Sequence, residues 1–254
     1  MGHRFATACL GITALFATAV GCSDGRVKTD AVGSFGGTSG VWLDVTQDST
    51  TGQYQEHRFV LTTEPGYCRK VQSAYPEMGE AYTSFLETIQ ANPLDTELQC
   101  EAEGVYLQQL AEASSKLFKG DALALTLSIR DPKMDQKDIP PDGTYGHDFD
   151  GEQMYWSGGI TQYTDNPWEV FAEKHDCTVP DWEFEAYNRI EEVIEVYPSD
   201  GGSVTAVRNG DHTFKLDVDG ELNDDQGRNA GTLKASGRFS RCEVRLDGEP
   251  LIWF

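Results

Sequence analysis

The stretch Leu123-Ala-Leu-Thr-Leu-Ser-Ile-Arg130 places a large apolar side chain at every second position. Successive side chains of a β-strand point to opposite faces, so this period of two predicts a strand with one apolar face. Similar patterns predict a hairpin from strands at 41–45 and 54–63, and further antiparallel strands after residue 204. The chain therefore predicts a β-rich domain built on an antiparallel sheet.

A helical period separates these two groups of strands. Pro76 precedes one apolar stripe, and a second follows Asn92-Pro93, which predicts two helices. The stripes comprise Met78, Tyr82, Phe85 and Ile89, then Leu98, Val105, Tyr106, Leu110, Ala113 and Leu117. We therefore predict an α+β fold, an antiparallel β-sandwich or flattened barrel with a helical hairpin inserted at about 76–119. Residues 166–196 fit a helix and a strand equally well.

The apolar positions change phase within the last predicted strand. Leu233, Ala235 and Phe239 share one face, whereas Cys242 and Val244 fall on the other. One extra residue in a strand produces such a change, so we predict a β-bulge near 240–241.

The N-terminal residues have the features of an export signal. A small basic region precedes an apolar run from Ala6 to Ala19, which is shorter than the roughly 20 residues that span a membrane. The run leads into Ala19-Val20-Gly21-Cys22, which resembles a bacterial lipobox. In that family of signals the cysteine is lipidated and becomes the new N-terminus, which here implies palmitate or a similar lipid on Cys22. An ordinary secretory signal cut nearby is the alternative.

This signal divides the chain into three parts. We predict a signal peptide at 1–21, a lipidated cysteine and flexible spacer at 22–40, and a single β-rich domain at 41–254. The spacer prediction rests on the polar, glycine-rich sequence between Ser23 and Gly40. Ser23 stands where an aspartate would retain a lipoprotein at the inner membrane, so the resemblance implies the outer membrane, facing the periplasm or the cell surface.

The cysteines suit an exported protein. Of the six, Cys9 leaves with the signal and Cys22 takes the lipid, so four remain. An even number in an oxidising compartment predicts two disulfides, with three possible connectivities. We favour Cys68–Cys100 and Cys177–Cys242, because each bridge then stays within its own half of the chain. The wide spacing and the lack of a Cys-x-x-Cys motif argue against a zinc site.

The formal net charge of −22 disfavours two kinds of partner. Such a surface repels nucleic-acid phosphates, so we predict no nucleic-acid binding. It also repels anionic lipids, so membrane attachment is expected through the lipid anchor rather than through a basic patch. We predict no cofactor and no metal ion.

No motif in the sequence specifies an enzyme chemistry. Outside the predicted lipobox region at 21–25, the chain has no Gly-x-Ser-x-Gly motif, and it has no His-Glu-x-x-His pair. His147-Asp148-Phe149-Asp150 offers metal ligands, but a solvated acidic loop explains it better. The acidic residues of Asp217-Val-Asp219-Gly-Glu221 depart from the EF-hand spacing and fit the solvent-exposed face of a strand.

Aromatic side chains concentrate between Tyr155 and Tyr187. Aromatics on a rigid β scaffold bind sugars or peptides, although many pack in the core instead. We take Trp156, Tyr163 and Trp168 as candidate binding residues for a protein or saccharide partner.

Three segments carry a family resemblance. Phe59–Cys68 is a strand followed by a cysteine, Gly143-Thr144-Tyr145 follows a long loop, and Gly231-Thr-Leu233 runs on to Gly237-Arg-Phe239 and Cys242. Together they resemble uncharacterised lipoproteins of Gram-negative, myxobacterial-type envelopes. The resemblance implies a β-rich domain and brings no activity with it.

The sequence thus predicts a lipid-anchored envelope protein that acts by non-enzymatic binding or structural presentation. One alternative is a carrier of a hydrophobic ligand within the β core, which requires an apolar cavity. The other is an envelope hydrolase that uses His147 or the long loop, which requires clustered titratable groups in a cleft.

Overall fold

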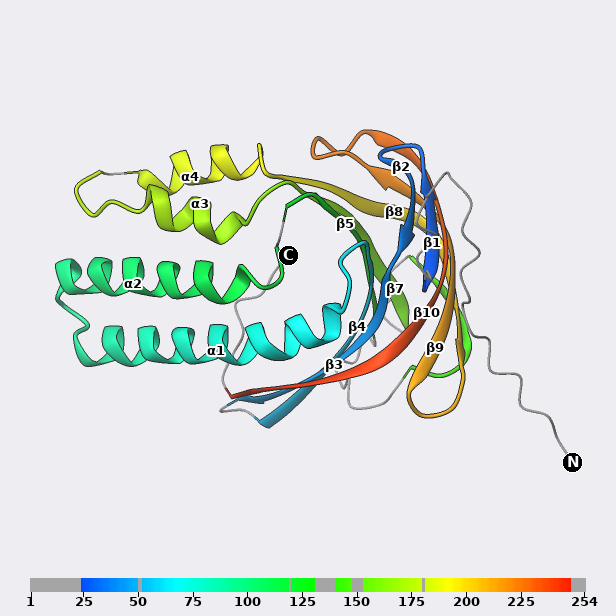
Figure 1. Ribbon diagram of the computed structural model, residues 1–254, viewed down its shortest axis with the longest axis horizontal. Helices are drawn as coiled ribbons and strands as arrows, with labels where there is room; N and C mark the ends of the chain where they lie inside the picture. The colour runs from blue at the N-terminus through cyan, green and yellow to red at the C-terminus, as the bar shows by residue number, and fades with distance from the viewer. Residues whose placement is uncertain are drawn as a thin grey trace, which may run out of the picture.

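The computed structural model describes residues 24–49, 52–118, 120–130, 140–147, 153–179 and 181–247, which form ten strands and four helices (Figure 1). The strands are β1 (Gly25–Thr29), β2 (Gly33–Gly37), β3 (Ser39–Ser49), β4 (Gly52–Thr62), β5 (Ala122–Arg130), β6 (Gly143–Gly146), β7 (Tyr155–Tyr163), β8 (Ile194–Arg208), β9 (Thr213–Asn223) and β10 (Asn229–Asp247). The helices are α1 (Tyr67–Ala91), α2 (Thr96–Ser114), α3 (Pro167–Lys174) and α4 (Trp182–Ile190). The α+β class and the β-rich, mostly antiparallel character are as predicted. Cys22 and the predicted signal peptide lie outside the described residues.

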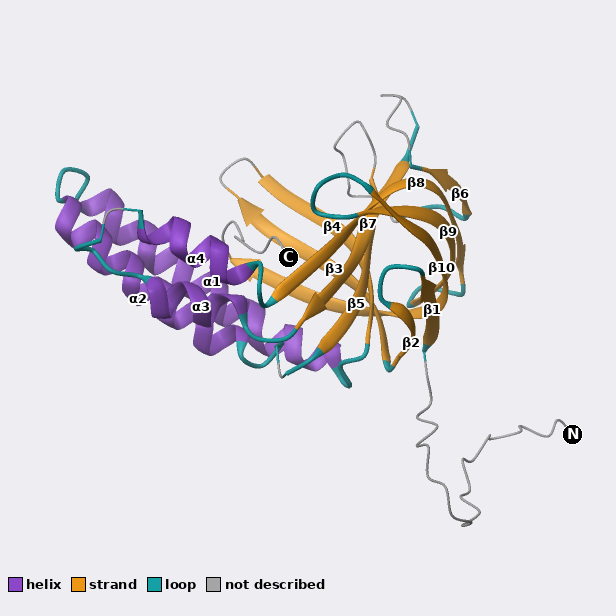
Figure 2. Ribbon diagram, turned by 90° about the horizontal axis from the view of Figure 1, so that it is seen from above, coloured by secondary structure: helices purple, strands orange, loops and turns teal. Residues whose placement is uncertain are grey.

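The ten strands belong to one sheet whose pairings close into a ring. The ring runs through β3, β4, β5, β7, β8, β9 and β10, and β10 then returns to β3. The first part of β10 pairs antiparallel with β9, and its last part pairs parallel with β3, where Ser240 lies opposite Val41. With 19 residues, β10 is long enough to reach both neighbours and so closes the ring. Figure 2 shows the strong curvature of the sheet.

Several strands are buried on both faces. On β5, Leu125, Leu127 and Ile129 belong to a cluster inside the ring, whereas Ala122 and Ala124 belong to an outer cluster beneath the helices. The inner cluster includes large side chains that are almost fully buried, namely Trp42, Phe59, Trp156, Phe214 and Phe239. Apolar alternation therefore marks the inner face, and small residues opposite it leave room for the helices.

The apolar positions of β10 change phase because the strand buries its inner face first and its outer face later, and no bulge is needed. Phe239 points into the ring, whereas Cys242 and Val244 point outward into the outer cluster. The register of β10 shifts only near its start, between Asn229 and Gly231, and then runs regularly to Ser240 against β9 and onward from Ser240 against β3. The predicted bulge near 240–241 is therefore wrong, because the buried face changes while the backbone stays regular.

The predicted flexible spacer at 22–40 is wrong over most of its described length, because β1 and β2 form a hairpin there. β1 pairs with β10, and Val27 and Phe35 are buried in the inner cluster. A Cβ atom at Gly37 would lie 2.3 Å from the side chain of Leu61. At this position glycine therefore serves close packing against the sheet rather than flexibility.

Helices α1 to α4, which we call the helical arm, project from one side of the sheet (Figure 2). The predicted insertion at 76–119 begins too late, since α1 starts at Tyr67 and continues through Pro76. An internal proline costs a helix about 3 kcal/mol. Burial of Val71, Ala74 and Met78 against the sheet offsets that cost. No helix within the described residues combines the length and apolar character needed to span a membrane.

The ambiguous segment 166–196 forms α3, α4 and the start of β8. Asn166, which is 2% exposed, fixes where this segment leaves the sheet. Its Oδ1 accepts hydrogen bonds from the Trp168 backbone N–H at 3.1 Å and from Ser114 Oγ at 3.0 Å, and its Nδ2 donates to the Ala111 carbonyl at 3.0 Å. One side chain thus caps α3 and ties it to the end of α2.

All four predicted cysteines form disulfides, but the predicted pairing is wrong. The bridges are Cys68–Cys242 and Cys100–Cys177, with Cα separations of 5.7 and 5.9 Å. Because α1 is unbroken and rises about 1.5 Å per residue, Cys68 in its first turn lies far from the arm tip, near which Cys100 sits in α2. Cys68–Cys242 therefore joins the arm to the sheet, and Cys100–Cys177 lies within the arm.

Candidate functional site

The three aromatic residues predicted as binding candidates do not form one surface. Trp156 is fully buried inside the ring, and Tyr163 is 8% exposed within the outer cluster. Trp168 packs partly buried between the outer cluster and a third cluster around Trp182. Trp156 therefore lies in a different core from Tyr163 and Trp168, and the three side chains do not form one exposed surface.

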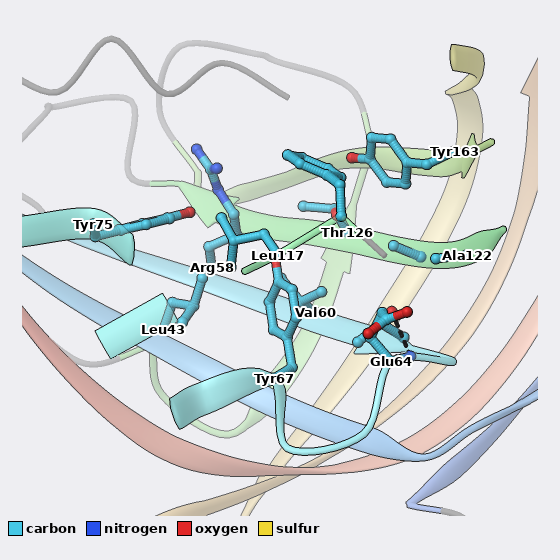
Figure 3. Close-up of a pocket in the computed structure, with 13 residues that line it drawn as sticks. Leu43, Arg58, Val60, Glu64, Tyr67, Tyr75, Leu117, Ala122, Thr126 and Tyr163 are labelled. Atoms are coloured by element: carbon cyan, nitrogen blue, oxygen red, sulfur yellow. Dashed lines mark hydrogen bonds between the residues drawn. The ribbon is translucent and has the colours of Figure 1, made fainter. Parts of the chain in front are cut away.

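A small cavity lies where the arm meets the sheet (Figure 3). Tyr67 and Tyr75 approach it from α1, and Tyr163 approaches it from β7. Burial raises the pKa of Tyr163 to about 12 and also raises that of Tyr67, so both phenols stay neutral. The cavity measures about 20 Å³, which is room for one water molecule and for no organic ligand.

A charged group is buried inside the ring at the junction of β3 and β10. Arg241 donates two hydrogen bonds to Asp44 Oδ2, one from Nε at 2.8 Å and one from an Nη atom, and its guanidinium lies 5.5 Å from the Trp42 ring centroid. The Trp42 indole N–H donates to His57 Nδ1 at 3.3 Å, and the same nitrogen lies 3.8 Å from Asp44 Oδ1. Asp44 and His57 are 3% and 2% exposed. This group links β3 to β10 where the ring closes, with Asp44 and His57 buried and the Arg241 side chain 24% exposed.

His147, which the sequence placed in the long loop, lies directly after the short strand β6. Its Nε2 lies 3.1 Å from Ser199 Oγ, and its ring packs edge-on against Trp156 at 5.2 Å. Ser199 Oγ also accepts a hydrogen bond from the Gly158 backbone N–H at 3.1 Å. Asp148 and Asp150, the other ligands predicted with His147, lie outside the described residues.

The helical arm brings together side chains with metal-ligand and redox chemistry. Cys100 and Glu103 lie one turn apart on α2, His175 ends α3, and Cys177 follows two residues later. His175 Nε2 lies 3.5 Å from Cys100 Sγ and 3.7 Å from Glu103 Oε2. We call Cys100, Glu103, His175 and Cys177 the arm cluster.

Local packing holds His175 against α2. Its side chain is 9% exposed, and its ring meets Trp182 edge-on at 4.7 Å. A Cβ atom at position 104 would lie 2.8 Å from the His175 ring, so Gly104 is what permits the close approach. Burial raises the pKa of Glu103, and the nearby His175 opposes that shift.

Sequence reasoning missed the arm cluster because its two pairs of residues lie more than 70 residues apart along the chain. The available signals were the pairs Cys100-x-x-Glu103 and His175-x-Cys177, each of which places two ligand types close together. Neither pair alone is specific. Only the contact between α2 and the end of α3 unites them.

The helical arm also carries most of the exposed apolar surface. Among the described residues, seven large hydrophobic side chains are exposed, and five of them lie on the arm. These five are Leu94, Val105, Val179, Phe184 and Tyr187. The other two, Val196 and Val207, lie on β8.

A groove runs between α1 and α2. Phe85, Leu98, Val105 and Tyr106 contribute apolar surface to it, and Phe85 stacks on Tyr106 at 4.9 Å. The Tyr106 hydroxyl is buried and has no hydrogen-bond partner within the described part of the chain. A neighbouring hollow along the same helices carries acidic residues, namely Glu77, Glu80 and Glu112. The arm therefore offers apolar contacts beside negative charge.

The chain matches no protein-family model, no curated protein and no solved structure.

Proposed function

We propose that this chain is a lipid-anchored protein of the cell envelope whose helical arm binds another protein without catalysing a reaction. The observation that carries this proposal is the gathering of exposed apolar side chains on the arm, five of the seven among the described residues. Soluble surfaces rarely gather such side chains unless they meet a partner. The acidic residues beside the groove favour a partner segment that is both apolar and basic.

The proposed anchor fits a role in presentation. The lipid would be attached at Cys22, and two residues further on Asp24 is already fixed to the sheet. Its backbone bonds Gly37 and Arg238, each at 2.8 Å, and its side chain accepts from Gly40 N–H at 2.9 Å. Two residues span at most about 7 Å, so β1 and β2 would lie close to the membrane. The arm extends from the opposite end of the molecule and would point away from it (Figure 1).

We interpret the closed ring as a flattened barrel rather than a sandwich, and its filled interior supports binding at the surface. Inside it, Phe59 contacts Phe214 and Phe239 with ring centroids 5.3 and 5.7 Å apart, and Trp42 contacts Phe214 at 5.0 Å. These aromatic rings occupy the space that a carried hydrophobic ligand would need. The carrier alternative therefore has less support than surface binding.

One observation favours a second candidate, the envelope hydrolase. The contact of His147 Nε2 with Ser199 Oγ is the geometry of a base beside a nucleophile. A fluorophosphonate probe tests it directly. Labelling of Ser199 that disappears in His147→Ala would establish the hydrolase, and an unlabelled wild type would remove it.

Comparative capture tests the binding proposal. Full-length protein is cross-linked in the envelope and purified as wild type, as the arm variant Phe184→Ser/Tyr187→Ser, and as the control Val196→Ser/Val207→Ser. We expect a specific protein to copurify with the wild type and the control and to fall at least about tenfold with the arm variant. Equal recovery with all three would contradict binding through the arm.

The anchor has a separate test, which does not depend on the partner. Cys22→Ser removes the only thiol at the proposed cleavage site and should move the protein from the membrane fraction to the soluble periplasm. Membrane association that survives this substitution would contradict the lipid anchor.

A further inference from the structure

The arm cluster brings together four side chains that are ligands for soft and borderline divalent cations. The ligand atoms of Cys100, His175 and Cys177 all lie within 4.8 Å of one another, and Glu103 Oε2 lies 3.7 Å from the same His175 nitrogen. Zinc is bound by this kind of set, with cysteine sulfur, histidine nitrogen and carboxylate oxygen at the corners of a tetrahedron.

Two edges of that tetrahedron already have the required length. Ordinary zinc–ligand distances give about 3.5 Å between a bound nitrogen and a bound sulfur, and about 3.4 Å between a bound nitrogen and a bound oxygen. His175 Nε2 lies 3.5 Å from Cys100 Sγ and 3.7 Å from Glu103 Oε2. The two sulfurs must separate, because they are joined in the disulfide.

We propose that reduction of the Cys100–Cys177 disulfide converts the arm cluster into a tetrahedral zinc-type site formed by Cys100, Glu103, His175 and Cys177. The reductant is a dithiol, which gives two electrons and two protons to the disulfide and is itself oxidised to a disulfide. Binding of Zn²⁺ then displaces one proton from each of the two new thiols. The sequence argued against a zinc site because it contains no Cys-x-x-Cys motif, whereas the fold assembles the ligands from α2 and the end of α3.

The two disulfides differ in accessibility, which directs reduction to the arm. Cys100 and Cys68 are both half-buried, but their partners differ: Cys177 is exposed, whereas Cys242 is 1% exposed. A reductant must reach a sulfur in line with the bond, so exposed disulfides exchange faster than buried ones.

The surrounding structure keeps the ligands in place when the bridge opens. His175 is held between Trp182 and Gly104, and its backbone N–H still bonds the Phe171 carbonyl at 3.0 Å. Cys100 and Glu103 lie on a helix whose N-terminus is capped by Asp95. The metal would therefore link α2 to the end of α3 as the disulfide does, which makes the arm stable under both oxidising and reducing conditions.

Cobalt binding tests the proposal on the full-length protein. The protein is reduced under anaerobic conditions with a phosphine, because thiol reductants compete for the metal, and alkylation with peptide mapping identifies the bridge that opened. We expect the Cys100–Cys177 bridge to open first and one Co²⁺ to bind with the absorption of a tetrahedral thiolate complex. The oxidised protein should show no such absorption, and Zn²⁺ should displace the cobalt.

Variants assign the site to the arm. His175→Ala and Glu103→Gln should weaken cobalt affinity at least about tenfold, since even changes outside the ligand shell cost that much. His212→Ala, in the exposed turn before β9, is the matched histidine control and should bind as the wild type does. Helix content of each metal-free variant is measured by circular dichroism, and Glu103→Gln keeps the test valid if His175→Ala unfolds. No cobalt absorption after reduction, or unchanged affinity in Glu103→Gln, would overturn the proposal, as would preferential opening of Cys68–Cys242.

Discussion

The closed ring and the helical arm use their apolar side chains in opposite ways. The ring encloses its aromatic residues, and its strands leave only Val196 and Val207 among the exposed large hydrophobic side chains of the described residues. The arm buries one apolar stripe against the sheet and exposes Leu94, Val105, Val179, Phe184 and Tyr187. The two disulfides differ as well: Cys68–Cys242 joins the arm to the sheet, and Cys100–Cys177 lies within the arm, where Cys177 is exposed. The ring thus buries the largest aromatic side chains, and the arm carries the arm cluster and most of the exposed large hydrophobic side chains of the described residues.

Truncating an aromatic side chain inside the ring should have the largest effect on stability. Phe59 is 0% exposed, and Phe59→Ala should lower the free energy of unfolding by about 3–5 kcal/mol, through lost burial and the cavity that remains. Phe184 on the arm is 67% exposed, and Phe184→Ala should change it by less than about 0.5 kcal/mol. Urea unfolding followed by tryptophan fluorescence measures both. Similar losses for the two variants would break the division between ring and arm.

Removing the two disulfides should separate global from local stability. Cys68→Ser/Cys242→Ser should cost about 2–4 kcal/mol and shift the unfolding of the whole molecule, because this bridge closes 174 residues and joins arm to sheet. The Cys100–Cys177 bridge closes only 77 residues, so Cys100→Ser/Cys177→Ser should cost about 0.7 kcal/mol less from chain entropy. Hydrogen exchange should show its loosening confined to α3 and α4. Uniformly faster exchange in the second variant would contradict a self-contained arm.

Substituting Asn166, the buried residue that caps α3, should have a smaller effect on stability. Asn166→Ala removes the cap of α3 and leaves Ser114 Oγ and the Ala111 carbonyl with fewer partners, so we expect a loss of about 1–2 kcal/mol. Asp95 caps α2 at the exposed tip through a 3.0 Å bond from the Leu98 N–H, and Asp95→Ala should cost about 0.5–1 kcal/mol. Thermal unfolding of the two variants ranks the caps. A larger loss for Asp95→Ala would show that the cap at the tip of the arm matters more for stability than the Asn166 cap of α3.

The sequence was most informative where one physical requirement decided a residue. The alternation in Leu123 to Arg130 identifies a strand because the inner face of the ring must be apolar. It failed where two requirements compete. Gly37 resembles a linker residue but is needed for close packing against Leu61, and Pro76 resembles a helix boundary but lies in a helix that buries its neighbours.

The candidate site was the least predictable part. Trp156, Tyr163 and Trp168 were chosen for their chemistry, but their burial depends on the fold, which places Trp156 inside the ring and the other two in or against the clusters outside it. The arm cluster depends on two elements that meet only in space. Its closest contact, between His175 and α2, requires the glycine at 104, and nothing local in the sequence reveals that requirement.

The smallest expected effect is a pH dependence of opposite sign in the two regions. Burial raises the pKa of Glu103 in the arm above its usual 4.5, so its ionisation opposes folding; that cost is absent below about pH 4.5 and appears as the pH rises through the raised pKa. In the sheet, hydrogen bonds from the Thr232 N–H and hydroxyl, both 2.9 Å, lower the pKa of Asp30 below 3.8. Its stabilisation is present above pH 3.8 and is lost as the pH falls through the lowered pKa.

Amide substitutions at these two carboxyls test the sign. At neutral pH, Glu103→Gln should raise the melting temperature slightly, because it removes a disfavoured charge, and the difference from the wild type should vanish below about pH 4.5. Asp30→Asn should lower it at neutral pH, with the difference shrinking only once the pH falls below 3.8. Melting curves at neutral pH and at these two acidic values separate the two responses. Melting-temperature shifts of the same sign for the two variants at neutral pH would contradict the opposite effects that we expect from ionising Glu103 and Asp30.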